Sequence, residues 1–252
     1  MNLRRCFVPR QLLFLLAAGL ISFERPALSQ ESITLRTGQT QEVRILGVTP
    51  GGIKVQMGEA VMVQPFSNLT QVTMNPPPEY TAAATEYERG DLRGALTLAS
   101  SVVQNYRGLP TDWAREAMLM LGDIYVGLGQ LPQAGAAFKD YQRAYPATDS
   151  AEVNVGLASI DVANNNDDAA RAKIAPVLDQ ALKVRNPSKV AAALIGRAFF
   201  VSGKIKEHAG DFPGALEDYL RTVAIFPQDR VAAAGAQAAA DSLRKAHGTT
   251  VQ

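Results

Sequence analysis

The side chains that could carry acid–base or metal chemistry are few in this sequence. It contains two histidines, His208 and His247, and one cysteine, Cys6. Covalent catalysis needs a nucleophile beside a base, and a catalytic metal needs a cluster of ligands. His208 follows Glu207 in a predicted helix and His247 stands close to the C-terminus, so neither offers a triad. The sequence therefore predicts no catalytic residue and no enzyme.

The densest group of polar ligands is the run 164–168, three asparagines and two aspartates. Carboxylate and amide oxygens are ligands that Ca²⁺ prefers, but a calcium loop of the EF-hand type spaces them alternately and ends in a distal glutamate. This run has neither feature, and asparagine and aspartate also cap helices. No glycine-rich phosphate loop follows a predicted strand. We expect no metal and no cofactor, and we interpret the run as a helix cap.

The composition excludes a broad electrostatic attraction. Lysine and arginine number 25 and aspartate and glutamate 24, a formal net charge of +1. Without a basic excess there is no field to attract a nucleic acid or an anionic membrane surface. Hydrophobic residues make up 47%, which in 252 residues is enough for one or two cores. We expect a folded chain whose partner is not a nucleic acid.

A leader precedes the folded part. Three arginines come before the apolar run 12–21, and Ala27 and Ser29 are small residues at the two positions that a signal peptidase reads. The run has about half of the ~20 residues that a bilayer-spanning helix needs. We predict a signal peptide over residues 1–29, cleavage before Gln30, and export to the periplasm or the medium; a retained anchor is the alternative. Because the single cysteine lies in the leader, the processed chain would carry no thiol. We also expect the processed chain to have no membrane span.

The strongest pattern is a helix, a tight turn and a second helix over residues 115–148. Apolar residues in the first helix recur at steps of three and four, as on the buried face of an amphipathic helix. Gly122 and Ala134 leave almost no side chain on the two helices, so the helices can approach closely. Gly129 marks the turn, and Pro146 follows the end of the second helix. The two helices are predicted to form one hairpin.

Similar units recur along residues 76–247. A small residue opens the second helix of each unit, at Ala95, Ala134, Ala175 and Ala215. These alanines are 39, 41 and 40 residues apart, and the turn phrase at 90–96 returns at 210–216. The pattern predicts four helical hairpins, a closing helix over 231–246 and a disordered tail over 248–252. The residues expected to pack the hairpins are Ala95, Gly122, Tyr125, Ala134, Phe138, Pro146, Ala175, Ala215, Tyr219 and Pro227.

Residues 30–75 change to a period of two, which is typical of strands. Ile33 and Leu35 alternate with polar residues, and the segment 50–52 is turn material between two β-rich runs. Five short strands in this length resemble a small SH3-like or Sm-like barrel. The module could cap the first hairpin, or its edge strand could bind a peptide by β-augmentation. Nucleic-acid binding, as in Sm-like folds, needs an aromatic and basic face that this segment lacks.

The landmarks of the unit at 115–148 are Leu-Gly, Tyr, Ala, Phe and Pro in that order, and they resemble the tetratricopeptide repeat. The resemblance implies an α-solenoid, in which stacked hairpins cover each other's apolar faces and curve into a right-handed superhelix. It also implies a non-catalytic scaffold that binds a partner polypeptide on the concave face lined by the first helices. With its leader and small β module, the chain is similar to exported bacterial members that act in the cell envelope.

Helical spacing indicates which side chains face the concave surface. The candidates for partner binding are Tyr87, Glu116, Asp123, Asn154, Arg197 and Lys204. The function we expect is a protein-interaction scaffold in the cell envelope. The main alternative is a structural protein that self-associates through the repeats, giving a homo-oligomer.

Overall fold

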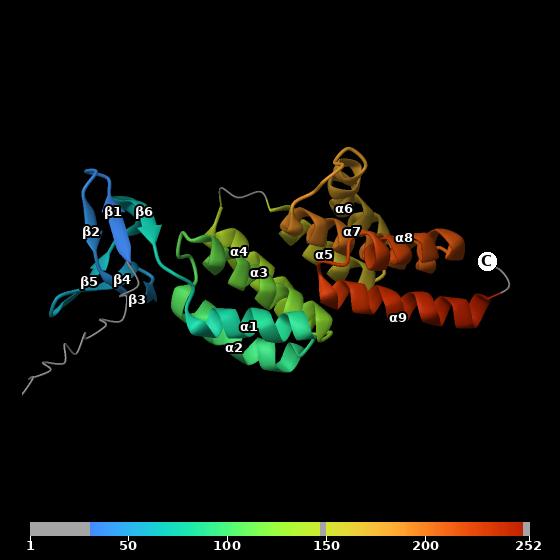
Figure 1. The fold of residues 1–252 in the computed structure, drawn as a ribbon, viewed down its shortest axis with the longest axis horizontal. Helices are drawn as coiled ribbons and strands as arrows, with labels where there is room; N and C mark the ends of the chain where they lie inside the picture. The colour runs from blue at the N-terminus through green and yellow to red at the C-terminus, as the bar shows by residue number, and fades with distance from the viewer. Residues whose placement is uncertain (1–30, 147–149, 249–252) are drawn as a thin grey trace, which may run out of the picture.

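The computed structural model describes residues 31–146 and 150–248 (Figure 1). Over these residues two small antiparallel sheets are followed by nine α-helices in a repeated array. The predicted fold class is confirmed: the chain is mainly α, with four helical hairpins behind a small β module. The predicted signal peptide and residues 249–252 of the predicted tail lie outside the described residues.

The β module forms because its apolar residues alternate with polar ones. Its strands are β1 (Ser32–Leu35), β2 (Thr40–Glu42), β3 (Arg44–Thr49), β4 (Gly52–Met57), β5 (Ala60–Gln64) and β6 (Leu69–Thr73). They pair antiparallel in two sheets of order β2-β1-β6 and β3-β4-β5. Ile33, Ile45 and Val55 are buried between them. Six strands replace the five predicted, because a break at Val43 divides the second run into β2 and β3.

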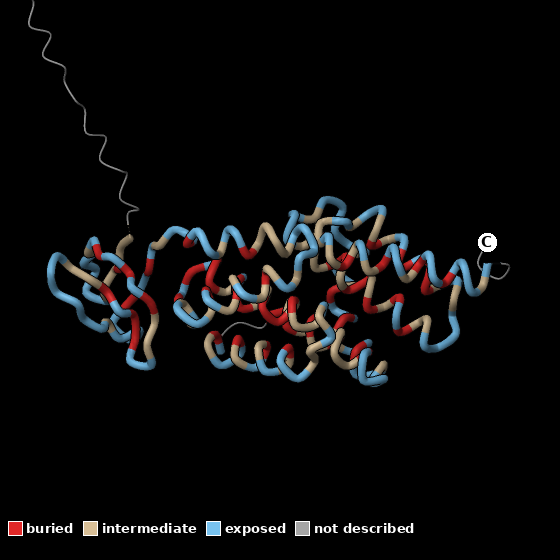
Figure 2. The backbone as a smooth tube through the Cα atoms, turned by 90° about the horizontal axis from the view of Figure 1, so that it is seen from below, coloured by how far each residue is buried: buried red, intermediate tan, exposed pale blue. Residues whose placement is uncertain are grey.

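The helices form four hairpins and a closing helix. Their bounds are α1 (Pro78–Arg89), α2 (Leu92–Tyr106), α3 (Asp112–Gly127), α4 (Leu131–Ala144), α5 (Ala151–Ala163), α6 (Asp167–Ala181), α7 (Lys189–His208), α8 (Phe212–Ala224) and α9 (Arg230–His247). Consecutive helices pack as the pairs α1/α2, α3/α4, α5/α6 and α7/α8, and α9 packs on α8 and α7. Figure 2 shows buried residues along the inner sides of the helices and in the centre of the β module.

Each hairpin turns through one residue with a left-handed backbone. Gly90, Gly129 and Gly210 have φ values of +82°, +70° and +77°. The third hairpin has Asn165 at the same place, with φ +59°. Asparagine is among the few non-glycine residues that adopt this conformation readily. The third turn therefore lacks the glycine of the other turns but has the same left-handed backbone geometry.

Phe138 holds three helices together at close range. Its ring projects from α4 into the space between Gly122 on α3 and Gly156 on α5, and a Cβ at either glycine would overlap the ring. The ring is fully buried. The fourth hairpin repeats the arrangement with Tyr219 of α8 against Gly203 of α7. The predicted close approach at Gly122 is therefore present, and its counterpart on the next hairpin is Gly156.

The register assigned to the third hairpin was wrong. Ala175 is exposed on α6. The buried counterpart of Ala95 and Ala134 is Ala170, the fourth residue of α6. The true spacings are therefore 39, 36 and 45 residues, because the third hairpin turns early and α7 is 20 residues long.

The remaining packing candidates divide into two groups. Ala95, Ala134, Phe138, Ala215 and Tyr219 are buried, and Gly122 is buried as well; Tyr125 is partly buried against its neighbours. Pro146 and Pro227 are exposed and follow the ends of α4 and α8. These prolines mark where helices end and do not pack the hairpins.

The β module is docked on the first two hairpins and shares a core with them. Leu109 and Trp113 belong to the same buried cluster as the strand residues. The indole Nε1–H of Trp113 donates a hydrogen bond of 2.9 Å to the carbonyl of Met74. On β3, Gly47 lies against the carbonyl of Asn105 at the end of α2, where a Cβ would come within 3.0 Å. The predicted division at residues 75–76 falls between β6 and α1, but the core crosses it.

The glycine at position 122 can be tested by adding a single methyl group. Gly122→Ala should lower the free energy of unfolding by roughly 1 to 3 kcal/mol, because the methyl group overlaps the Phe138 ring. The matched control is Gly135→Ala in α4, where a Cβ meets nothing within 4 Å. It should raise stability by up to about 1 kcal/mol, since alanine favours helices. Denaturant unfolding measures both, and a stabilised Gly122→Ala protein would contradict the packing.

Removal of the β module should destabilise the helices. A chain that begins at residue 76 leaves Leu109 and Trp113 without their cover from the strands. We expect a lower thermal midpoint by circular dichroism, together with increased binding of a hydrophobic dye. A truncated chain that melts at the same temperature as the full chain would show that the shared core contributes nothing to the array.

Candidate functional site

The first helices of the hairpins line a groove. Residues from α1, α3, α5 and α7 surround a cavity of about 540 Å³, together with Tyr141 of α4 and the residues around the start of α9. Helix α1 packs against α3 on one side and against α9 on the other, so the first and last helices of the array are in contact. The result is a bounded hollow, of a size that holds a short segment of another molecule.

An ion cluster joins three hairpins at the base of this groove. The guanidinium of Arg197 on α7 makes two hydrogen bonds to the carboxylate of Asp123 on α3, one of them 2.6 Å between Nη1 and Oδ2. Its Nε lies 3.8 Å from Oδ2 of Asp229, to which the hydroxyl of Tyr87 donates at 3.4 Å. The side chains of Arg197, Asp123 and Asp229 are only 16%, 11% and 8% exposed. Paired arginine–carboxylate bonds with this geometry are directional and strong.

Burial changes the protonation of these groups. The pKa of Asp123 is raised to about 7; burial is the largest cause, the charge of Arg197 opposes it, and the charge of Asp229 adds to the rise. Burial lowers the pKa of Arg197, but the charge of Asp123 more than reverses this, so Arg197 remains a cation. Burial, together with the charges of Asp123 and Asp229, raises the pKa of Tyr87 well above its ordinary value. Tyr87 is therefore a neutral hydrogen-bond donor.

Four of the six predicted partner-binding residues line the groove. Tyr87, Asp123 and Arg197 do so within the ion cluster, where Arg197 binds Asp123 and Tyr87 donates to Asp229. Glu116 lies at the exposed rim and accepts a hydrogen bond of 2.5 Å from the hydroxyl of Tyr80. The sequence indicated that these side chains share one surface, but it did not show that all four already have partners within the chain.

Asn154 and Lys204 are not among the lining residues. Asn154 is half-buried on α5. Lys204 is exposed on α7, with its Nζ 4.8 Å from the ring centre of Phe200. Partner binding by any of the six residues stays a prediction.

Two lining residues that the sequence did not indicate have unsatisfied polar atoms. Nε of Arg115 and Oε1 of Gln228 are buried, and neither has a hydrogen-bond partner among the described residues. A buried polar atom without a partner costs free energy, so such atoms are rare. Gln228 lies in the connection before α9 and not on a first helix, so helical spacing alone could not select it.

The groove is lined by more acidic than basic side chains. Among the described residues, six acidic and four basic side chains line it. The acidic residues are Glu88, Asp112, Glu116, Asp123, Glu152 and Asp229, and the basic residues are Arg115, Lys189, Arg197 and Arg230. The groove thus favours a ligand with positive charge.

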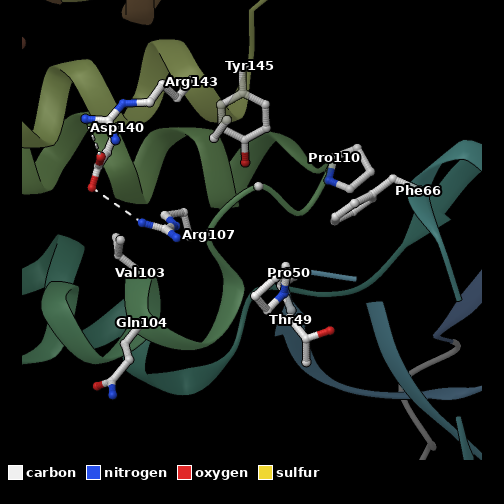
Figure 3. A pocket seen from close by; sticks show the side chains of 13 residues that line it. Thr49, Pro50, Phe66, Val103, Gln104, Arg107, Pro110, Asp140, Arg143 and Tyr145 are labelled. Atoms are coloured by element: carbon white, nitrogen blue, oxygen red, sulfur yellow. Dashed lines mark hydrogen bonds and ion pairs between the residues drawn. The ribbon is translucent and has the colours of Figure 1, made fainter. Parts of the chain in front are cut away.

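A larger cavity of about 830 Å³ lies between the β module, the end of α2 and the second hairpin (Figure 3). Phe66, Pro110 and Tyr145 line it. Arg107 and Arg143 both contact the carboxylate of Asp140, at 3.5 and 3.3 Å. Since these charged groups already pair with each other, the cavity offers fewer groups to a ligand than the groove does.

The described residues contain no cluster of three or more potential metal-binding side chains among histidine, cysteine, aspartate and glutamate. In the same part of the chain, none of the helices has the length and apolar character needed to cross a bilayer.

The comparisons with known proteins agree with the fold. A family model described as the tetratricopeptide repeat matches residues 116–148, which cover most of α3 and all of α4. The hairpin α3/α4 is thus similar to a tetratricopeptide repeat, in a chain of the tetratricopeptide type. A search of curated proteins finds no match, and neither does a search of solved structures. The recognised repeat is the hairpin that contains Gly122 and Phe138, and the other hairpins share its left-handed turn and the buried alanine near the start of the second helix.

The ion cluster can be tested through Arg197. Arg197→Met leaves Asp123 and Asp229 buried without a cation, which should cost about 3 kcal/mol of stability at neutral pH. Without Arg197, the carboxyl of Asp123 would have a higher pKa in the folded than in the unfolded chain, so the folded chain binds a proton more readily. The loss of stability in Arg197→Met should therefore become smaller when the pH is lowered from 7.5 to about 5. The control Arg89→Met removes an exposed pair and should change stability by less than about 1 kcal/mol. Urea titrations at the two pH values measure the difference, and equal losses in the two variants would contradict the role of Arg197.

Proposed function

We propose that this chain is a non-catalytic protein-interaction scaffold, which holds a short segment of a partner polypeptide in the groove of its first helices. The observation that carries the proposal is the groove itself, which is lined by the first helices. It combines two carboxylates that form no ion pair with another described residue, Glu116 and Glu152, with exposed apolar surface at Val190. Carboxylates and apolar side chains on one surface are able to bind the side chains of a short polypeptide segment.

The charges of the groove favour a segment with lysine or arginine. Three cations of the groove are already paired: Arg197 with Asp123, Arg115 with Asp112 at 2.9 Å and Lys189 with Glu88 at 3.8 Å. The carboxylates of Glu116 and Glu152 accept hydrogen bonds from hydroxyl groups, at 2.5 and 2.9 Å, and no ion pair between them and another described residue is present. These two carboxylates are available to a basic side chain of the partner.

The apolar wall of the groove adds the second requirement. Leu119 and Met120 on α3 face it from one side, and Val190 and Leu194 on α7 from another. Val190 is 63% exposed, so a ligand could cover it. We infer that the preferred segment combines apolar side chains with at least one basic one.

The proposal is tested by selecting short peptides from a random display library on the full chain. We expect peptides rich in lysine or arginine together with leucine, isoleucine or methionine. Replacing Glu116→Gln and Glu152→Gln together should weaken binding about tenfold, as for the loss of about 1.4 kcal/mol from two partly exposed charge pairs. Calorimetry or fluorescence anisotropy gives the affinities.

The matched control is Glu217→Gln on α8, which is an exposed carboxylate outside the groove. It should leave the affinity unchanged. Selection of acidic peptides, or equal binding by the double variant and the control, would count against this site.

The proposal places the scaffold outside the cytoplasm, in the cell envelope. Its support is the pattern of residues 1–29, three arginines, an apolar run and small residues before Gln30. N-terminal sequencing of the protein from its producing cells tests it. A chain that begins at Gln30 is expected, and one that begins at Met1 would remove the localisation without affecting the groove.

A further inference from the structure

β5 differs from the other strands at the edges of the two sheets. It pairs with β4 and with no other strand of the described residues, and it lies at the end of the molecule away from the helices (Figure 1). Val61, Met62 and Val63 are 52%, 39% and 46% exposed. Three consecutive apolar side chains at a free edge are an unusual feature of a folded chain, because such an edge invites pairing with another strand.

The other edges are covered or polar. β2 ends in Glu42, and β6 exposes Thr70 and Gln71. β3 is covered by α2, where Gly47 lies against Asn105. β5 has none of these protections: it contains no charged residue and no proline, and its register with β4 continues without a bulge over five pairs.

The sequence of β5 reads almost alike in both directions. It is Ala-Val-Met-Val-Gln, with Met62 at its centre. In an antiparallel pair of two such strands centred on Met62, Val61 of each copy faces Val63 of the other and Met62 faces Met62. Each central apolar side chain then meets an apolar side chain, and such cross-strand pairs stabilise sheets. We propose that β5 pairs with β5 of a second copy of this chain, about a two-fold axis through Met62.

The neighbouring strand supports this arrangement. Met62 lies opposite the fully buried Val55 of β4, while Val61 and Val63 lie opposite Gln56 and Lys54. Residues opposite each other in an antiparallel pair point to the same face of the sheet. The dimer would therefore be a six-stranded sheet, in which two methionines meet on the buried face and four valines pack side by side on the other face.

The interface is short at both ends. Gly58, with φ +59°, precedes β5 and Pro65 follows it directly, so the pairing covers about one strand of five residues. A contact of this size gives a weak association that depends on concentration. The groove lies on the helices, away from β5, so each dimer would present two grooves and could bind a repetitive partner with avidity. The proposed dimer does not depend on the function of the groove.

Disulfide trapping tests the register. In the full chain with Cys6→Ser, which contains no other cysteine, Met62→Cys puts two thiols at the axis. Directly opposed residues have Cα atoms about 4.5–5.5 Å apart, within the range of a disulfide. Under mild oxidation this variant should form a covalent dimer. Val61→Cys and Val63→Cys place like residues diagonally, about 7–8 Å apart, and should give several-fold less; Thr70→Cys on β6 should give only background.

Sedimentation velocity over a range of concentrations tests the dimer without a crosslink. The unmodified chain should show a dimer fraction that rises with concentration, and Val61→Lys with Val63→Lys should abolish it. Leu182→Lys, at a more exposed apolar residue on the helical array, should leave the dimer intact. Circular dichroism and melting curves confirm that each variant is folded. Three results would each overturn the proposal: a chain that stays monomeric at all concentrations, a dimer that survives the double variant, or crosslinking that is not strongest at position 62. The first of these results would favour pairing of β5 with a strand of a different protein.

Discussion

Phe138 projects from α4 into a space that exists only because α3 and α5 carry glycine where they pass it. A ring held between two helix backbones sets the distance between consecutive hairpins, and Tyr219 does the same within the fourth hairpin. Close-packed interiors do not tolerate even one additional methyl group without a shift. The curvature of the array, and so the shape of the groove, depends on these contacts between an aromatic side chain and a small one.

The groove follows from this packing, but its charges come from distant parts of the chain. Asp123 and Arg197 are 74 residues apart in sequence and form a paired contact at the base of the groove. Such a buried pair contributes little net stability, since both groups lose water, but removal of one partner is costly. The pair holds hairpins two and four in a defined relation, while Glu116 and Glu152 form no ion pair with another described residue and are the groups proposed to receive a basic side chain of the ligand.

The β module has two different sides. One side shares a core with the second and third helices through Trp113 and Leu109, so it is part of the same folded unit as the repeats. The opposite side presents β5, the apolar strand of the module that no other described element covers. A module that is docked at one side and open at the other can join the array to a further strand without altering the groove.

The local patterns of the sequence were sufficient for the class of each element and for the order β module, hairpins, closing helix. Helical periodicity, glycine turns and alternating strands depend on neighbouring residues, so they can be recognised without the tertiary structure. They also led to a wrong register, because Ala175 keeps a regular spacing while Ala170 is the residue that is buried. The return of α1 to α9, the pairing of Arg197 with Asp123 and the unsatisfied atoms of Arg115 and Gln228 were decided by the tertiary structure alone. They depend on how much each hairpin rotates against the next, and that rotation is the outcome of many side-chain contacts between residues far apart in the chain.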